Sequence, residues 1–260
     1  MTGSRRDTDS GRDGRRDFDR SADTEGGTGT HTLIGMTSLA GAAAAAAVCV
    51  AASPYLARLT LTVPDGENAR WWRGATAGRT RTALTAVAAL VLGALAGAAA
   101  GISALLPAFL ALALAAAPLV VIDYEHHRLP NRLVYPAGIA GIVLLAVAAA
   151  VRGEWHEYLR AIEGGVAAYL VLFVLMFISP KSFGWGDVRI GGILGGYLGY
   201  LGWIAVYYGI FAGFLLGSVV ALVLIGARRA TMKSAIAFGP MLLLGALIVL
   251  AFDITPALNR

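Results

Sequence analysis

Residues 83–122 read ALTAVAALVLGALAGAAAGISALLPAFLALALAAAPLVVI, forty consecutive residues without a charged side chain. A bilayer core of about 30 Å is crossed by roughly 20 residues of α-helix, because each residue adds about 1.5 Å. One helix of this length would be about twice too long, so the stretch predicts two transmembrane helices. Gly101 lies between the two halves and is the expected hairpin position.

The rest of the chain repeats this pattern of long apolar runs separated by short polar segments. With residues 188–227 divided near Gly202, the sequence predicts an all-α, polytopic membrane bundle of about eight transmembrane helices, within a domain over residues 32–257. The expected spans are residues 33–52, 83–100, 102–122, 133–151, 161–179, 188–204, 206–227 and 235–252.

Composition also favours a membrane protein. Hydrophobic residues make up 57% of the chain and charged residues 14%, which is far from the mixture of an ordinary soluble domain. The formal charge of +5 comes mostly from Arg and Lys residues between the apolar runs. This distribution indicates how the protein is oriented in the membrane and does not indicate a nucleic-acid partner. Cys49 is the only cysteine and lies in an alanine-rich run, so an intramolecular disulfide is impossible and a packing role is expected.

The polar segments predict the orientation. Residues 1–31 hold six arginines and seven acids among Gly, Ser and Thr, and they are expected to form a disordered tail. Beyond the tail, twelve Arg and Lys residues lie in 53–82, 123–132, 180–189 and 228–234, against three on the opposite side. The positive-inside rule makes these four segments cytoplasmic, with 53–82 as the first cytoplasmic loop. The arginines of the tail oppose this assignment, but acids are interspersed with them.

Acidic side chains near the spans are few, because a charge at the centre of a transmembrane helix costs about 2.5–3.5 kcal/mol on insertion scales. Six of the nine acids outside the tail have surface positions; Asp123, Glu125 and Asp187 remain, all on the predicted cytoplasmic side. Asp123 ends the third span and Asp187 opens the sixth, at one membrane level. Two facing carboxylates can share a proton and so supply a general acid and a general base for attack of water on a peptide carbonyl.

Simpler roles exist for the same residues. Asp187 is placed to cap its helix, and Asp123 to be solvated at the membrane edge. Gly184 and Gly186 allow a substrate backbone to come close, since they lack a Cβ atom. Trp185, between these glycines, fits an interfacial aromatic belt and is a weaker candidate for substrate contact.

Two further features have mainly structural interpretations. Gly191, Gly195 and Gly199 are spaced four apart, which allows a neighbouring helix to pack closely. His126 and His127 are adjacent in a charged segment, where histidines usually face water, and no metal site is expected.

Three segments resemble the type IV prepilin peptidases, a family of Gly-x-Gly-Asp aspartyl proteases. They occur in the family's order, and the resemblance covers about residues 100–252. The segments are Asp123 with Pro130-Asn131-Arg132-Leu133, the run Gly184-Trp185-Gly186-Asp187-Val188-Arg189, and Phe238-Gly239-Pro240 within residues 237–245.

The resemblance implies that Asp123 and Asp187 are the catalytic pair, in agreement with the elimination above. It implies prepilin or pseudopilin precursors as substrates, whose short basic leader is removed at the cytoplasmic face of the bacterial cytoplasmic membrane. Membrane lipid is the other expected partner, and no cofactor is expected. The motif residues expected to contact substrate are Gly184, Trp185, Gly186, Pro130, Asn131, Arg189, Phe238, Gly239 and Pro240.

The sequence departs from the family pattern in two places. Asn131 stands where the family often has a second aspartate, which leaves the catalytic pair intact. Residues 53–82 lack the paired cysteines that longer, methylating members carry, so peptidase activity is expected without N-methyltransferase activity or S-adenosylmethionine. Two alternatives stay open: a transporter or channel that uses the aspartate pair, and an inactive pilin-assembly factor. The sequence makes no prediction of oligomeric state.

Overall fold

The computed structural model describes residues 13–62, 76–126, 129–179, 184–227 and 238–252, and within these ranges all regular structure is helical. The chain divides into two compact units, Met1–Thr37 and Ser38–Arg260, and the second contains both candidate aspartates. The predicted all-α bundle with eight main helices is confirmed. These are α1 (Asp13–Leu59), α2 (Arg79–Ala100), α3 (Leu106–His126), α4 (Asn131–Arg152), α5 (Trp155–Ile178), α6 (Trp185–Leu201), α7 (Trp203–Gly226) and α8 (Gly239–Ala251), with a short 3₁₀ helix, η1 (Thr60–Thr62).

Six of these helices are long and apolar enough to cross a membrane, the first of them over Met36–Leu59 within α1. The other five are α2, α3, α4, α5 and α7. The two hairpin positions predicted from helix length are confirmed, because Gly101 and Gly202 end α2 and α6 with φ of 58° and 155°. Both are values that glycine adopts more readily than other residues.

The prediction of a membrane span over residues 235–252 is wrong in length. Helix α8 begins at Gly239 and has 13 residues, which is about 20 Å and less than the thickness of the hydrocarbon core. Pro240 occupies its first turn, where a proline fits because the first N–H groups of a helix have no intrahelical partner. Residues 235–237 lie outside the described part of the chain.

The predicted first loop, residues 53–82, is shorter at both ends. Helix α1 continues through Pro54 to Leu59, and α2 already begins at Arg79. A proline inside a membrane helix is tolerated when the freed backbone groups find other partners. Residues 63–75 of this loop lie outside the described part.

The start of α1 also differs from expectation. The helix begins at Asp13, inside the segment 1–31 that the sequence predicts to be a disordered tail. No proline precedes Pro54 in the chain, so none interrupts this part of the helix.

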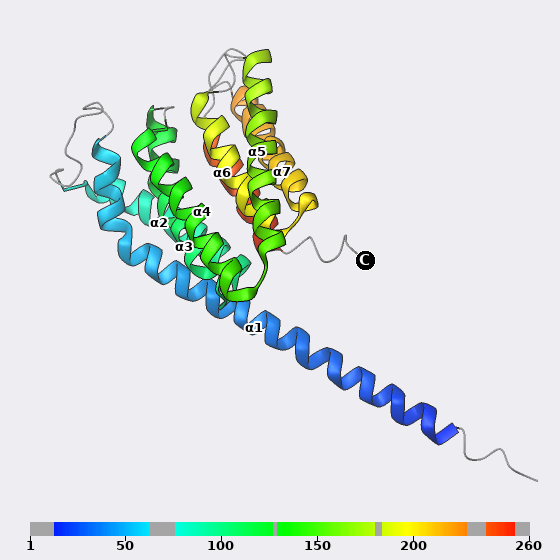
Figure 1. Cartoon of the computed structure of the whole chain (residues 1–260). Coiled ribbons are helices and arrows are strands. Elements are labelled where there is room, and N and C mark those ends of the chain that lie inside the picture. Colours follow the sequence, from blue (N-terminus) through cyan, green and yellow to red (C-terminus); the bar gives the residue numbers. More distant parts are fainter. Residues whose placement is uncertain (1–12, 63–75, 127–128, 180–183, 228–237, 253–260) are drawn as a thin grey trace, which may run out of the picture. The chain divides into compact units, whose positions relative to one another are not determined.

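Helix α6 packs on α5 through the glycines that the sequence analysis assigned to close packing (Figure 1). A Cβ atom on Gly195 would lie 2.4 Å from the Cβ of Ala168 and 2.6 Å from the carbonyl oxygen of Gly164. A Cβ on Gly199 would lie 2.7 Å from the carbonyl oxygen of Arg160. The prediction of close helix packing is therefore confirmed.

Replacing Gly195 with valine is expected to lower stability by at least about 2 kcal/mol, because neither Ala168 nor the backbone of Gly164 can give way without separating the helices. The measurement is the melting temperature of the purified protein in detergent. Gly226→Val is the matched control, since a Cβ there meets no atom within 4 Å. Equal melting temperatures for the two variants would contradict the packing assignment.

Tyr197 fixes α6 against α3. Its hydroxyl donates a hydrogen bond of 2.9 Å to the carbonyl oxygen of Ala108, and its ring meets that of Phe109 edge to face at 5.4 Å between centroids. Both aromatic residues are almost fully buried. This contact holds α3 and α6 in a fixed relation. Since these helices carry the two candidate aspartates, it also helps to fix the positions of Asp123 and Asp187.

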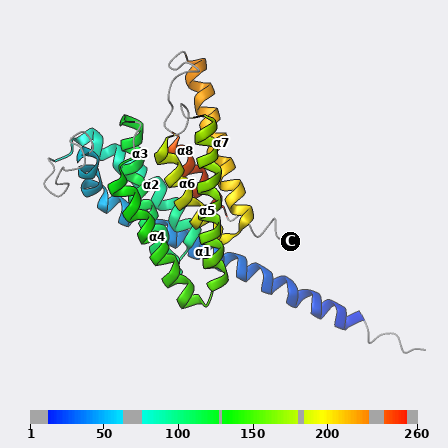
Figure 2. The same ribbon diagram turned by 45° about the horizontal axis from the view of Figure 1, so that its top comes forward.

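Helix α8 lies among α2, α3, α6 and α7, as Figure 2 shows. Its apolar side chains are buried on nearly all sides, including Leu242, Leu243 and Leu247. A helix surrounded by protein need not match the bilayer thickness, so α8 can be short and begin inside the bundle. Its first residue, Gly239, is thereby placed beside α3 and α6.

Candidate active site

Asp123 lies in the last turn of α3 and is buried, with 4% of its surface exposed. Ile122 before it is fully buried. Among the described residues, Asp123 Oδ2 is the one buried side-chain oxygen or nitrogen without a hydrogen-bond partner. An unpaired buried carboxylate oxygen is costly in free energy, so its presence indicates that Asp123 has a functional role and not a packing role.

Asp187 occupies the first turn of α6 and uses its two oxygens differently. Its Oδ2 accepts a 3.1 Å hydrogen bond from the N–H of Gly184, while its own N–H donates to the Gly184 carbonyl at 3.1 Å. The helix-capping role weighed from the sequence is thus present. It occupies only one oxygen and leaves Oδ1 facing the interior of the bundle.

The two aspartates come together at Gly239, the first residue of α8. A Cβ on Gly239 would lie 3.0 Å from Asp123 Oδ2 and 3.5 Å from Asp187 Oδ1, so the two oxygens are no farther apart than the sum of these distances. The Gly239 backbone amide faces both carboxyl groups. The N-termini of α6 and α8 therefore both point their positive dipole ends at the pair, which favours negative charge there.

Leu129 completes this arrangement and was missed by sequence reasoning. A Cβ on Gly186 would lie 2.7 Å from Leu129 Cδ1, and one on Gly239 would lie 3.3 Å from the same atom. The Leu129 side chain thus lies against Gly186, one of the glycines expected to contact a substrate backbone. The available signal was an apolar residue directly before Pro130 in an otherwise charged segment.

Asn131 and Arg189 form a contact between α4 and α6, and Pro130 directly precedes α4. The Pro130 carbonyl accepts the first backbone hydrogen bonds of α4. Arg189 Nη1 donates to Asn131 Oδ1, and the guanidinium lies 5.3 Å from the ring centroid of Tyr135. In the structure Asn131 and Arg189 therefore join α4 to α6.

Trp185, Phe238 and Pro240 likewise contact neighbouring helices. Trp185 is half exposed and packs on Phe173 of α5, with 5.6 Å between ring centroids. Phe238 packs on Phe214 of α7 at 4.9 Å, and its ring lies over Gly217. Pro240 is buried in the first turn of α8. These contacts set the positions at which α6 and α8 begin.

The acids and histidines next to Asp123 are in ordinary surface contacts. Glu125 Oε2 accepts from Arg81 Nη2 at 2.5 Å and lies 3.7 Å from His126 Nε2. His127 lies outside the described residues. Within the described ranges, no cluster of three or more His, Cys, Asp or Glu residues is arranged to hold a metal ion.

Residues 108–226 match the family model for type IV leader peptidases, and this segment contains both aspartates and the Gly-x-Gly-Asp motif. This segment is similar to the type IV leader peptidase family. The chain is also 26% identical over 138 residues to a prepilin leader peptidase/N-methyltransferase of Pseudomonas putida. That match covers 51% of this chain and 45% of the relative, so less than half of the relative's length is represented. No solved structure matches the chain significantly.

The leader peptidase segment runs from α3 into the last residue of α7, and α8 lies beyond it. Gly239 therefore contributes to the aspartate pair from outside the part of the chain that the family model matches. The site is built from two helices within the leader peptidase segment and one helix that follows it.

Proposed function

We propose that the protein is a membrane-embedded aspartyl endopeptidase that removes the short basic leader of prepilin or pseudopilin precursors. The single observation that supports it best is the approach of Asp123 Oδ2 and Asp187 Oδ1 at the start of α8, in a buried position. The match of residues 108–226 to the leader peptidase family model supports the substrate class.

In the proposed mechanism, one aspartate deprotonates a water molecule while the other protonates the carbonyl oxygen of the scissile peptide. Asp187 has the capping N–H and the positive end of α6 beside it, both of which favour its ionised form. Asp123 lies near the negative end of α3, and its Oδ2 lacks a hydrogen-bond partner. The shared proton is therefore assigned to Asp123, and Asp187 acts first as the base.

The proposed orientation places the pair at the cytoplasmic face of the bacterial cytoplasmic membrane. Both aspartates lie at helix ends next to segments rich in Arg and Lys, which the positive-inside rule assigns to the cytoplasm. A leader that is basic and precedes an apolar helix would present its junction at this level. The scissile bond would then meet the carboxyl groups without entering the hydrocarbon core.

The proposal covers cleavage and excludes methylation. The relative from Pseudomonas putida is named as both peptidase and N-methyltransferase. Cysteine pairs in the first loop accompany methylation in the longer members, and residues 53–82 of this chain contain no cysteine. S-adenosylmethionine is therefore not a proposed cofactor.

Membranes containing the protein, incubated with a precursor pilin and S-adenosylmethionine, are expected to shorten the precursor by the mass of its leader. No methyl group is expected on the new N-terminus. Intact-mass spectrometry measures both changes, and membranes from the same host without the protein are the control. An uncut precursor would favour the transporter or assembly-factor alternatives, whereas an added methyl mass would refute the methylation part alone.

A further inference from the structure

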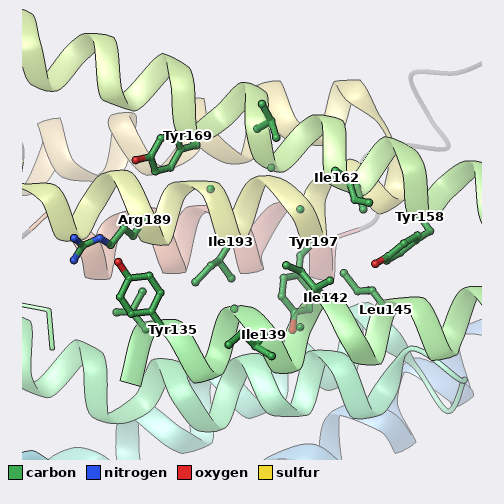
Figure 3. A pocket seen from close by; sticks show the side chains of 18 of the residues that line it. Tyr135, Ile139, Ile142, Leu145, Tyr158, Ile162, Tyr169, Arg189, Ile193 and Tyr197 are labelled. Carbon is green, nitrogen blue, oxygen red and sulfur yellow. The ribbon is translucent and has the colours of Figure 1, made fainter. Parts of the chain in front are cut away.

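A cavity of about 460 Å³ lies between α4 and α5, with α6 as its floor (Figure 3). Its walls are almost entirely apolar, and neither Asp123 nor Asp187 lines it. The side chains along its walls include Ile139, Ile142 and Leu145 of α4 and Ile162, Val166 and Leu170 of α5. Both of these helices are long and apolar enough to cross the membrane, so the rim of the cavity meets lipid.

One end of the cavity carries a positive charge. Arg189 and Tyr135 lie together at that end, and Tyr158 lies at the other, as Figure 3 shows. The partners of the Arg189 guanidinium are the neutral Asn131 side chain and the Tyr135 ring. No carboxylate of the described residues forms an ion pair with Arg189, so its charge remains available to an anion.

We propose that this cavity binds an anionic phospholipid, with one acyl chain in the apolar channel and the phosphate at Arg189. Basic pockets between transmembrane helices near the cytoplasmic side are a recurrent form of head-group site. Arg189 lies two residues after Asp187 in α6, so the phosphate would lie near the membrane level of the aspartate pair. Lipid binding here goes beyond the proposed peptidase activity and does not depend on it.

The chemistry of the lining matches a lipid, because the cavity is apolar along most of its length and has a cationic side chain, Arg189, at one end. Two of the glycines that line the cavity already pack between α5 and α6, because Gly192 lies against Tyr169 and Gly165 lies against Gly192.

The test is a titration of the purified protein with phosphatidylglycerol and with phosphatidylcholine, followed by native mass spectrometry. Arg189→Gln is expected to weaken phosphatidylglycerol binding about fivefold and to leave phosphatidylcholine binding unchanged. Arg79→Gln, an exposed arginine at the start of α2, is the charge control and is expected to change neither.

A second pair of variants tests the channel itself. Ile142→Trp is expected to weaken binding of both lipids at least fivefold, because the indole fills the cavity. Val143→Trp is the matched control, since Val143 is the next residue, is exposed to 53% against 57% for Ile142, and does not line the cavity. If Ile142→Trp does not fold, Leu170→Trp and its neighbour Val171→Trp form the equivalent pair on α5.

Three results would overturn the proposal. Equal lipid binding by the cavity variant and its neighbour control would exclude the channel. An equal loss of phosphatidylglycerol binding in Arg79→Gln and Arg189→Gln would show a diffuse charge effect. If Ile142→Trp raises KM for a precursor and leaves both lipid affinities intact, the cavity holds the substrate's apolar helix and not a lipid.

Discussion

Replacing either Asp123 or Asp187 with asparagine is expected to lower the rate of leader cleavage by at least about a thousandfold. An amide cannot accept the proton from the attacking water or pass one to the peptide carbonyl, so the loss of either carboxyl group removes half of the proton transfer. The two act as one unit, and the double variant is therefore expected to be no less active than the single variants. Cleavage is measured by the mass of a precursor over time.

Asparagine is the informative substitution because it leaves the local structure in place. At position 187 its carbonyl oxygen can still accept the hydrogen bond from the Gly184 N–H, so the cap of α6 survives. At position 123 the Oδ2 atom has no hydrogen-bond partner to lose. Both variants should therefore melt within a few degrees of the natural protein while losing activity.

The control for these variants is Glu163→Gln, an exposed acid on α5 that the mechanism does not use. It should cleave at the natural rate. A natural rate in Asp123→Asn or Asp187→Asn, with the protein correctly inserted, would end the aspartyl protease proposal. Loss of activity accompanied by loss of folding would instead be recognised from the melting temperature.

Most of the fold was predictable because bilayer thickness limits the length of a transmembrane helix. The forty apolar residues 83–122 had to contain a turn, and Gly101 is where it occurs. The same reasoning located the break at Gly202. Cys49 was expected to pack inside the protein, and it is fully buried, with its sulfur against Gly93 of α2.

The length rule fails where a helix is enclosed by other helices. Helix α8 is buried among four neighbouring helices. Its length therefore depends on where its N-terminus lies in the bundle and not on the thickness of the bilayer. The ends of α1 and α2 next to the first loop were also misplaced. Hydropathy falls at the membrane edge, whereas these helices continue past that point.

The aspartate pair was found by elimination, since few acids lie at the ends of apolar runs. The contribution of Gly239 and Leu129 to that site depends on tertiary contacts that no local pattern contains. For the same reason, motif residues that are adjacent in sequence were assigned one common role. In the structure Arg189 contacts α4, although it is only two residues from Asp187.

Gly239 is the position where the smallest change should disturb the site most. Gly239→Val is expected to lower cleavage about a hundredfold, because even its Cβ would lie 3.0 Å from Asp123 Oδ2 and 3.3 Å from Leu129 Cδ1. Valine adds two methyl groups to that crowding, so the carboxyl groups must move apart. The effect should fall on kcat and spare KM, since the displaced carboxyl groups hold the attacking water in the proposed mechanism.

A glycine at the start of another helix separates this crowding from a general effect on helix initiation. Gly78 precedes α2 with a negative φ, and a Cβ there meets no atom within 4 Å, so Gly78→Val should cleave normally. Gly239→Val should also melt close to the natural protein, because its nearest contacts are side chains that can shift. Normal kcat in Gly239→Val would mean that the pair has room beyond what the structure shows, and that the start of α8 does not set the distance between the two carboxyl groups.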